Sequence, residues 1–230
     1  MNKTIFVVAA HPDDEVLGCG GTILTTAPED VVIIGILGEG ITSRYPKRDE
    51  APIEELNSLE LQAKQVSSLL GASDLVLGGL PDNRFDSLDM LDIVQTIEQW
   101  IDKFNPGVVY THHPGDLNID HSTTYRCVLT ATRPTKDSGV KELYTFEVPS
   151  STEWAFQSLS PPFMPNTFVD VSDVIDRKVQ ALNVYEDEVR DFPHPRSSEG
   201  LKVVARRWGS VIGTNYAEAF QLIRSIRRDN

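Results

Sequence analysis

Cysteine, long apolar runs and positive charge are all scarce in this sequence. Its two cysteines, Cys19 and Cys127, are too few for a disulfide framework, and we expect both to be buried thiols in a reducing compartment. No run approaches the roughly 20 apolar residues that a membrane-spanning helix needs, and the apolar stretch 5–10 is too short for the core of a signal peptide. These absences predict a cytoplasmic protein with no integral membrane segment.

The charge balance is acidic, with 34 Asp and Glu against 21 Lys and Arg and a formal net charge of −13. Nucleic acids and anionic membranes require clustered cationic side chains on their partner, so we expect no nucleic-acid partner. At 230 residues the chain is long enough for one sizeable core, and we predict one domain over residues 1–230. The oligomeric state stays open, and a homo-oligomer is compatible with the sequence.

Short β-branched runs alternate with helical patterns over the first two thirds of the chain. We expect strands at 5–8, 31–37, 75–77, 108–111 and 144–148, and helices opening near 22 and covering 56–70, 91–104 and 121–132. This alternation is typical of an α/β fold with a doubly wound, mainly parallel sheet and helices on both faces, as in Rossmann-like proteins. Beyond it we expect a short strand at 168–171 and helices at 172–190, 198–208 and 217–227.

A polar turn directly follows the first predicted strand. It contains His11, Asp13 and Asp14 and leads into glycines at 18, 20 and 21. In an open α/β sheet, ligands bind at the carboxyl ends of the strands. A neutral imidazole and a carboxylate suit zinc, and a carboxylate between the two ligands suits a general base. The alternative is an acidic turn whose side chains cap a helix.

A second polar cluster follows the predicted strand 108–111. It supplies three of the five histidines of the chain, His112, His113 and His121. Because two strand ends of a parallel sheet meet in one crevice, a residue of this cluster is expected to complete the metal site. Our first choice is His121, with Asp120 or a nearby carbonyl group fixing its tautomer; His112 and His113 are the competitors.

The two clusters, AHPDDE at 10–15 and DLNIDH at 116–121, resemble the motifs of the zinc-dependent de-N-acetylases of the PIG-L/LmbE-like family. That family includes the N-acetylglucosaminyl-phosphatidylinositol deacetylase. The resemblance covers nearly the whole chain and implies an LmbE-like deacetylase domain. It implies zinc, or ferrous iron, on His11, Asp14 and His121. It further implies that zinc-bound water attacks an N-acetyl group of an N-acetylglucosamine-type sugar or glycoconjugate, with Asp13 as general base.

The chain departs from the family pattern at Asn118, where several members carry a histidine. An amide can stabilise an oxyanion but cannot deliver a proton. The leaving amine is therefore expected to take its proton from Asp13 or from another group such as His194. For substrate contacts we propose His194, Glu147 at a strand end, and Arg44 on the long loop after the second strand.

Two other functions fit the same residues. One is the hydrolysis of a non-sugar amide. The other is a non-catalytic sugar- or nucleotide-binding α/β module, because a glycine-rich helix N-terminus at a strand end can bind phosphate. Metal content distinguishes a metal-dependent hydrolase from the binding module, because phosphate binding does not require His11 or His121.

Overall fold

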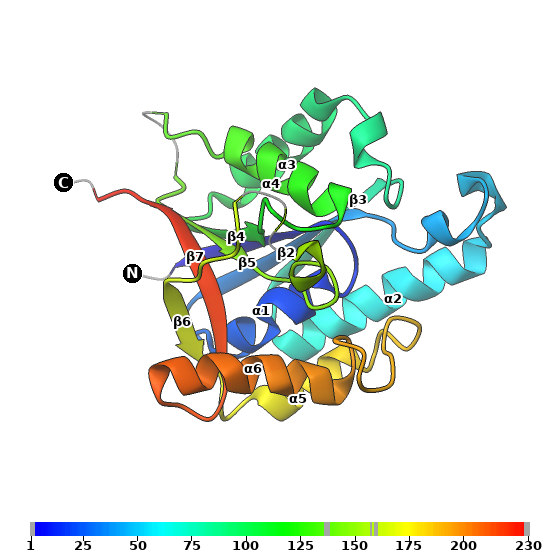
Figure 1. Cartoon of the computed structure of the whole chain (residues 1–230). Coiled ribbons are helices and arrows are strands. Elements are labelled where there is room, and N and C mark those ends of the chain that lie inside the picture. The colour runs from blue at the N-terminus through cyan, green and yellow to red at the C-terminus, as the bar shows by residue number, and fades with distance from the viewer. Residues whose placement is uncertain (1–2, 136–138, 157, 159–160, 228–230) are drawn as a thin grey trace.

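The computed structural model describes residues 3–135, 139–156, 158 and 161–227. Its centre is one seven-stranded sheet with the order β3-β2-β1-β4-β5-β7-β6 (Figure 1). The strands are β1 (Thr4–Ala9), β2 (Val31–Gly38), β3 (Asp74–Leu80), β4 (Val108–His112), β5 (Glu142–Phe146), β6 (Thr167–Asp170) and β7 (Ala217–Ser225). Strands β1 to β5 pair in parallel, whereas β7 pairs antiparallel with both β5 and β6. The predicted α/β fold with a mainly parallel sheet is confirmed.

Helices cover both faces of the sheet. They are α1 (Asp14–Thr25), α2 (Ile53–Leu70), α3 (Met90–Phe104), α4 (Ile119–Ala131), α5 (Ile175–Leu182) and α6 (Ser198–Ile212). In Figure 1, α3 and α4 lie above the sheet, and α1, α5 and α6 lie below it. Within the described ranges no helix is both long and apolar enough to cross a bilayer.

The side chains of β1 alternate between two hydrophobic cores. Val7 and Ala9 pack in the core that contains residues of α1, α2, α5 and α6, whereas Phe6 and Val8 pack against α3 and α4. Because both faces of these strands are buried, the strands are apolar throughout rather than alternating in polarity. This explains the short continuous apolar runs of the sequence.

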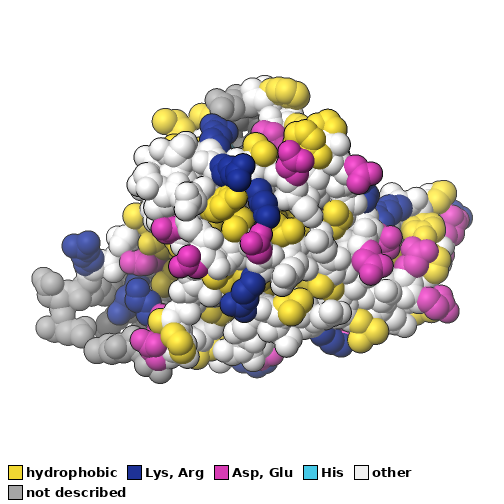
Figure 2. All heavy atoms as spheres, turned by 90° about the horizontal axis from the view of Figure 1, so that it is seen from below, with side chains coloured by type: hydrophobic (Ala, Val, Ile, Leu, Met, Phe, Trp, Pro, Cys, Tyr) yellow, Lys and Arg dark blue, Asp and Glu magenta, His cyan; other side chains and the backbone are white. Residues whose placement is uncertain are grey.

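The outer surface below α5 and α6 has a mixed character. In its described part, Figure 2 shows Lys and Arg side chains interspersed with Asp, Glu and apolar side chains over this face. The described residues of this face form no broad field of one charge.

Two predicted helices differ from the structure. Residues 217–227 were expected to be helical, but Ala217–Ser225 form β7, in which Ala217 to Phe220 pair with β6 and the strand also pairs with β5. The local pattern did not favour the strand, which forms because its hydrogen-bonding partners lie on distant segments. The helix expected at 172–190 is only α5, which begins at Ile175 and ends at Leu182.

Helix α1 begins at Asp14, earlier than predicted, and its backbone breaks at Cys19 (φ −147°, ψ 17°). The break frees the N–H groups of Gly21 and Thr22, and both donate to the carboxylate of Glu218, each at 2.7 Å. Lys178 completes the arrangement, because its ammonium donates to Glu218 at 2.5 Å and to the carbonyl of Leu17 at 2.9 Å. A buried ion pair thus fixes the helix that carries Asp14.

Replacing Lys178 with methionine should destabilise the fold by about 3–5 kcal/mol, because the substitution leaves the buried Glu218 without its counter-charge. Both side chains are only 4% exposed. The measurement is the free energy of unfolding in urea. The matched control is Lys202→Met, which removes an exposed ion pair with Asp176 and should cost no more than about 1 kcal/mol. Equal losses in the two variants would contradict this account.

Candidate metal centre

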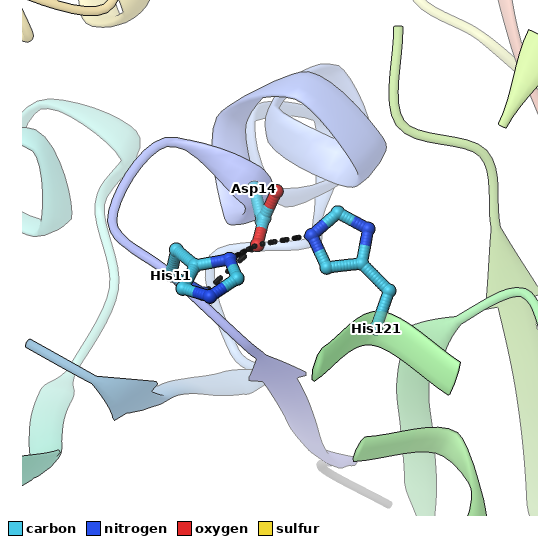
Figure 3. A group of neighbouring side chains, drawn as sticks. All are labelled: His11, Asp14 and His121. Atoms are coloured by element: carbon cyan, nitrogen blue, oxygen red, sulfur yellow. Dashed lines mark hydrogen bonds and ion pairs between the residues drawn. The ribbon is translucent and has the colours of Figure 1, made fainter. Parts of the chain in front are cut away.

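The crevice at the carboxyl ends of β1 and β4 brings together His11, Asp14 and His121 (Figure 3). His11 and Asp14 come from the turn between β1 and α1, and His121 comes from the first turn of α4. Asp14 and His121 are fully buried and His11 is 9% exposed. In Figure 3, one carboxylate oxygen of Asp14 lies between the two imidazole rings. The sheet therefore unites the two clusters that the sequence separates by about a hundred residues.

The distances within the cluster suit a tetrahedral cation. The Oδ2 atom of Asp14 lies 3.3 Å from Nδ1 of His11 and 3.3 Å from Nε2 of His121. Nitrogen and oxygen ligands at 2.0–2.1 Å from a tetrahedral zinc ion are separated from one another by about 3.3–3.4 Å. Hydrogen bonding also points to a missing ligand, because Nε2 of His121 and Oδ1 of Asp14 are buried with no hydrogen-bond partner in the described chain. These residues fit a metal ion with three protein ligands.

Each histidine of the cluster has a second carboxylate behind it. Oδ2 of Asp120 lies 3.0 Å from Nε2 of His11, and Oδ1 of Asp116 lies 3.2 Å from Nδ1 of His121. The expectation that Asp120 supports His121 was therefore wrong: it supports His11, and Asp116 lies behind His121. Such carboxylates orient a ligating imidazole and raise its basicity. Asp116 is itself held by the hydroxyl groups of Ser151 and Thr152.

The two competing histidines have other partners. Nε2 of His112 accepts the N–H of Ala10 at 2.8 Å, so its lone pair is occupied, and burial lowers the pKa of His112 to about 3. Nε2 of His113 lies 2.9 Å from the carbonyl oxygen of Pro161. Neither residue belongs to a three-ligand group in the described part of the chain.

Carboxylates dominate the electrostatics of the cluster. Burial acts to lower the pKa of His11, but hydrogen bonds to Asp120 and Asp14 outweigh it and raise this pKa to about 10. Burial likewise acts against the charged form of His121, but Asp14 and Asp116 raise its pKa to about 9. Without a metal ion, the surrounding carboxylates therefore favour the protonated form of both imidazoles.

Metal binding at pH 7.5 should release up to two protons, because a ligating imidazole nitrogen must lose its proton. The apparent affinity should then fall as the pH is lowered from about 9, by up to about 100-fold per pH unit when two protons are displaced. Calorimetric titration of the metal-free protein with Zn²⁺, in buffers of different ionisation enthalpy, counts the protons. Tight binding without proton release would contradict this description of the cluster.

In the sequence, Asp13 lies between the proposed ligands His11 and Asp14, and in the structure it lines the pocket in the crevice. Its backbone is in the left-handed region (φ 103°), and its carboxylate makes no hydrogen bond to the N-terminus of α1. Within the turn, Oδ2 of Asp14 accepts the backbone N–H of His11 at 2.8 Å, whereas the side chain of Asp13 does not cap the helix. Instead, Oδ2 of Asp13 accepts a hydrogen bond from Nη1 of Arg196 at 3.0 Å. Burial raises the pKa of Asp13, and Arg196 counteracts part of this rise.

Asn118 is the N-cap residue of α4. Its Oδ1 accepts the N–H of Asp120 at 2.8 Å, and its Nδ2 donates to Oδ1 of Asn83 at 2.9 Å. The cap fixes which end of the amide is the oxygen, and the bond to Asn83 uses one of the two hydrogens of the NH₂ group. Asn118 and Asn83 both line the pocket beside His11.

The pocket over the cluster has a volume of about 180 Å³ and a largely polar lining. Its ionisable residues are His11, Asp13, Arg44, Asp82, Glu188 and Arg196. Arg44 forms an ion pair with Glu188 across the pocket, joining the loop after β2 to the segment after α5. The structure therefore places Arg44 at the pocket, and its role as a substrate contact stays a prediction.

Glu147 and His194 lie elsewhere. The carboxylate of Glu147 accepts the indole N–H of Trp208 and lines two other cavities, one among α1, α6 and β7 and one beside Phe156 and Phe163. His194 contacts the ring of Trp154, and its Nδ1 accepts the backbone N–H of Arg196. Neither residue lines the pocket over the metal cluster, so their predicted roles as substrate contacts gain no support from their positions.

Four further residues of the site were not assigned to it from the sequence, namely Asp82, Asp116, Glu188 and Arg196. Asp82 lies 3.3 Å from Nε2 of His11. One signal was available for Asp116, since it precedes a proposed ligand in the same loop, as Asp120 does. Glu188 and Arg196 lie far along the chain in a segment expected to be helical or irregular, and only folding brings them to the crevice.

Comparison with known proteins is consistent with this site. Residues 6–132, more than half of the chain, match the model of the protein family described as GlcNAc-PI de-N-acetylase. A curated relative is the probable N-acetyl-alpha-D-glucosaminyl L-malate deacetylase 2 of Bacillus anthracis, which is 25% identical over 192 residues and 81% covered in both chains.

Solved structures share the fold over almost the whole chain. The N,N'-diacetylchitobiose deacetylase of Pyrococcus horikoshii has a TM-score of 0.77 at 18% identity, covering 96% of this chain and 84% of its own. GalB, the 4-carboxy-2-hydroxymuconate hydratase of Pseudomonas putida KT2440, has a TM-score of 0.75 at 20% identity, covering 99% of each chain. Because a deacetylase and a hydratase share this fold, the fold by itself does not identify the reaction.

Proposed function

The chain belongs to the GlcNAc-PI de-N-acetylase family, and on that basis we propose that it is a metal-dependent hydrolase that removes an N-acetyl group from an N-acetylglucosamine-type amino sugar. The observation that carries the proposal is the group of His11, Asp14 and His121, with the acidic side chain of Asp13 beside it in an open pocket. Three ligands and a free position are typical of catalytic metal sites, whereas structural zinc sites are closed by four ligands.

His11, Asp14 and His121 would hold the metal ion. Zinc is our choice because it accepts this combination of nitrogen and oxygen ligands, and ferrous iron is the alternative. When bound, the metal supplies Lewis acidity, which polarises the acetyl carbonyl group and makes water a stronger nucleophile. The carboxylates of Asp116 and Asp120 keep the two imidazoles in place.

Asp13 acts as the general base in this proposal. It lines the pocket next to the ligands, and its raised pKa makes it a better proton acceptor than an exposed carboxylate. It takes a proton from the attacking water and returns it to the departing amine. Asp13 takes this second role because the amide of Asn118 is not acidic enough to transfer a proton and His194 is not among the residues that line the pocket.

Asn118 assists the developing oxyanion. Its amide orientation is fixed by the helix cap and by Asn83, so its free N–H is held ready without reorganisation. Arg44, at the other wall of the pocket, is proposed to contact the sugar. A cytoplasmic location is part of the same proposal, supported by the unpaired, buried thiols of Cys19 and Cys127.

Acetate release from a panel of compounds tests the proposal. The panel contains N-acetylglucosamine, its malate conjugate, diacetylchitobiose and a non-sugar acetamide, each assayed with and without a chelator. We expect chelator-sensitive release from at least one sugar. Release from the acetamide alone would replace the sugar by another amide. No release from any compound by protein that contains metal would favour the non-catalytic binding module.

A further inference from the structure

Arg196 forms an ion pair with the proposed base, and its side chain is held on more than one side. We infer that Arg196 is a positioning residue, which orients the carboxylate of Asp13 so that one oxygen faces the attacking water. The inference rests on the proposed function and adds to it a residue from a segment about 180 positions away in the sequence.

The guanidinium group of Arg196 is anchored by three side chains. Nη1 donates to Oδ2 of Asp13 at 3.0 Å, Nε donates to the hydroxyl of Ser150 at 2.8 Å, and Nη1 lies 3.5 Å from Oε2 of Glu188. The side chain of Arg196 is 23% exposed, whereas that of Asp13 is 3% exposed. Charge-assisted hydrogen bonds of a planar guanidinium group fix direction as well as distance.

The two oxygens of Asp13 therefore have different environments. Oδ2 is occupied by Arg196, while Oδ1 has no hydrogen-bond partner among the described residues and belongs to a side chain that lines the pocket. No other Lys or Arg in the described chain forms an ion pair with Asp13. Without Arg196, the carboxylate would be free to rotate, and neither oxygen would be fixed toward the water.

The fold holds the segment that carries Arg196 firmly in place. The backbone N–H of Arg196 donates to Nδ1 of His194, and that of Ser197 donates to the carbonyl of His194. Gly200, in the first turn of α6, packs against this turn so closely that an added Cβ would lie 2.6 Å from the carbonyl oxygen of Pro195. This packing gives His194 a local structural role and fixes the base of the Arg196 side chain.

The glutamate beside Arg196 connects it to the pocket wall. Glu188 accepts from Arg44 through one oxygen and lies near Arg196 through the other. Arg196 therefore has a second anionic partner, and the loss of Arg196 leaves Glu188 paired with Arg44. A substitution at position 196 is thus expected to act on Asp13 more than on the pocket as a whole.

The test compares Arg196→Ala, Arg196→Lys and Ser150→Ala for kcat, KM and bound metal. A misplaced catalytic group can cost about 100-fold in rate, so we expect kcat of Arg196→Ala to fall about 100-fold. Its KM should stay within about threefold and its metal content unchanged. Added guanidinium should restore part of kcat in Arg196→Ala. Arg196→Lys and Ser150→Ala should fall between this variant and the wild type.

The matched control is Arg190→Ala. Arg190 lies in the same segment, is exposed, and donates from Nη1 to the backbone carbonyls of Asp187 and Val189. Wild-type kcat and KM are expected for it. Two results for Arg196→Ala would overturn the inference: an unchanged kcat, or a loss of kcat that comes with a loss of metal and does not respond to guanidinium. In either case, acetate release by the wild-type protein would leave the proposed function standing. Wild-type protein that contains metal and releases no acetate would overturn the proposed function, and the inference with it.

Discussion

Asp13→Asn should lose about 10²–10⁴-fold in turnover while binding as much metal as the wild type, because general-base catalysis contributes a factor of this size. Asparagine has nearly the shape of aspartate and tolerates the left-handed backbone at this position (φ 103°). Its amide oxygen can still accept from Arg196, but it cannot take a proton from water. Acetate release and metal content, measured on the same preparation, provide the test.

Asp86→Asn is the matched control for this variant. Asp86 is exposed, lies in the short 3₁₀ turn Phe85–Ser87 after the pocket loop, and is absent from the pocket lining. It should keep wild-type turnover. Wild-type turnover in metal-replete Asp13→Asn would remove Asp13 from the mechanism and leave only the metal site.

His121→Ala should lose both metal and activity. The substitution removes one of three ligands, and its loss should cost more than the 10–100-fold in affinity typical of losing an outer hydrogen-bond partner. It also leaves the buried carboxylates of Asp14 and Asp116 without the imidazole that lies between them. Metal content after dialysis, and the Zn²⁺ affinity of the refilled protein, measure the effect.

His113→Asn is the matched control, because it removes a histidine of the same loop that is not a proposed metal ligand. The ring of His113 contacts Phe163, and its Nε2 lies near the carbonyl of Pro161 rather than in the cluster. This variant should retain metal and activity. If His113→Asn lost the metal and His121→Ala retained it, His113 rather than His121 would be the third metal ligand.

The position of the cluster could be predicted because simple rules place its residues. His11 and His121 follow buried apolar runs, and adjacent parallel strands end at one edge of the sheet, so both had to face the same crevice. The structure agrees in bringing these two residues together with Asp14. Their partners were less predictable: Asp116 and Asp120 occupy one loop, and only the three-dimensional geometry decides which carboxylate serves which histidine.

The later part of the chain was predicted less well. The segment that became β7 contains alanine, glutamate and leucine, which favour helices, yet hydrogen bonding to β5 and β6 makes it a strand. Arg196 meets Asp13 only because α5 ends early and the following segment folds back over the crevice. No spacing rule connects positions so distant in the sequence.

The most direct test of the account is a metal titration of the stripped enzyme followed by acetate release. Zn²⁺, and Fe²⁺ in a parallel anaerobic series, is added in fractions of an equivalent, and the rate with the best sugar substrate is recorded after each addition. The account predicts that the rate rises in proportion to bound metal and levels off at about one ion per chain. Release that is undiminished in the stripped protein, or that does not follow occupancy, would contradict it.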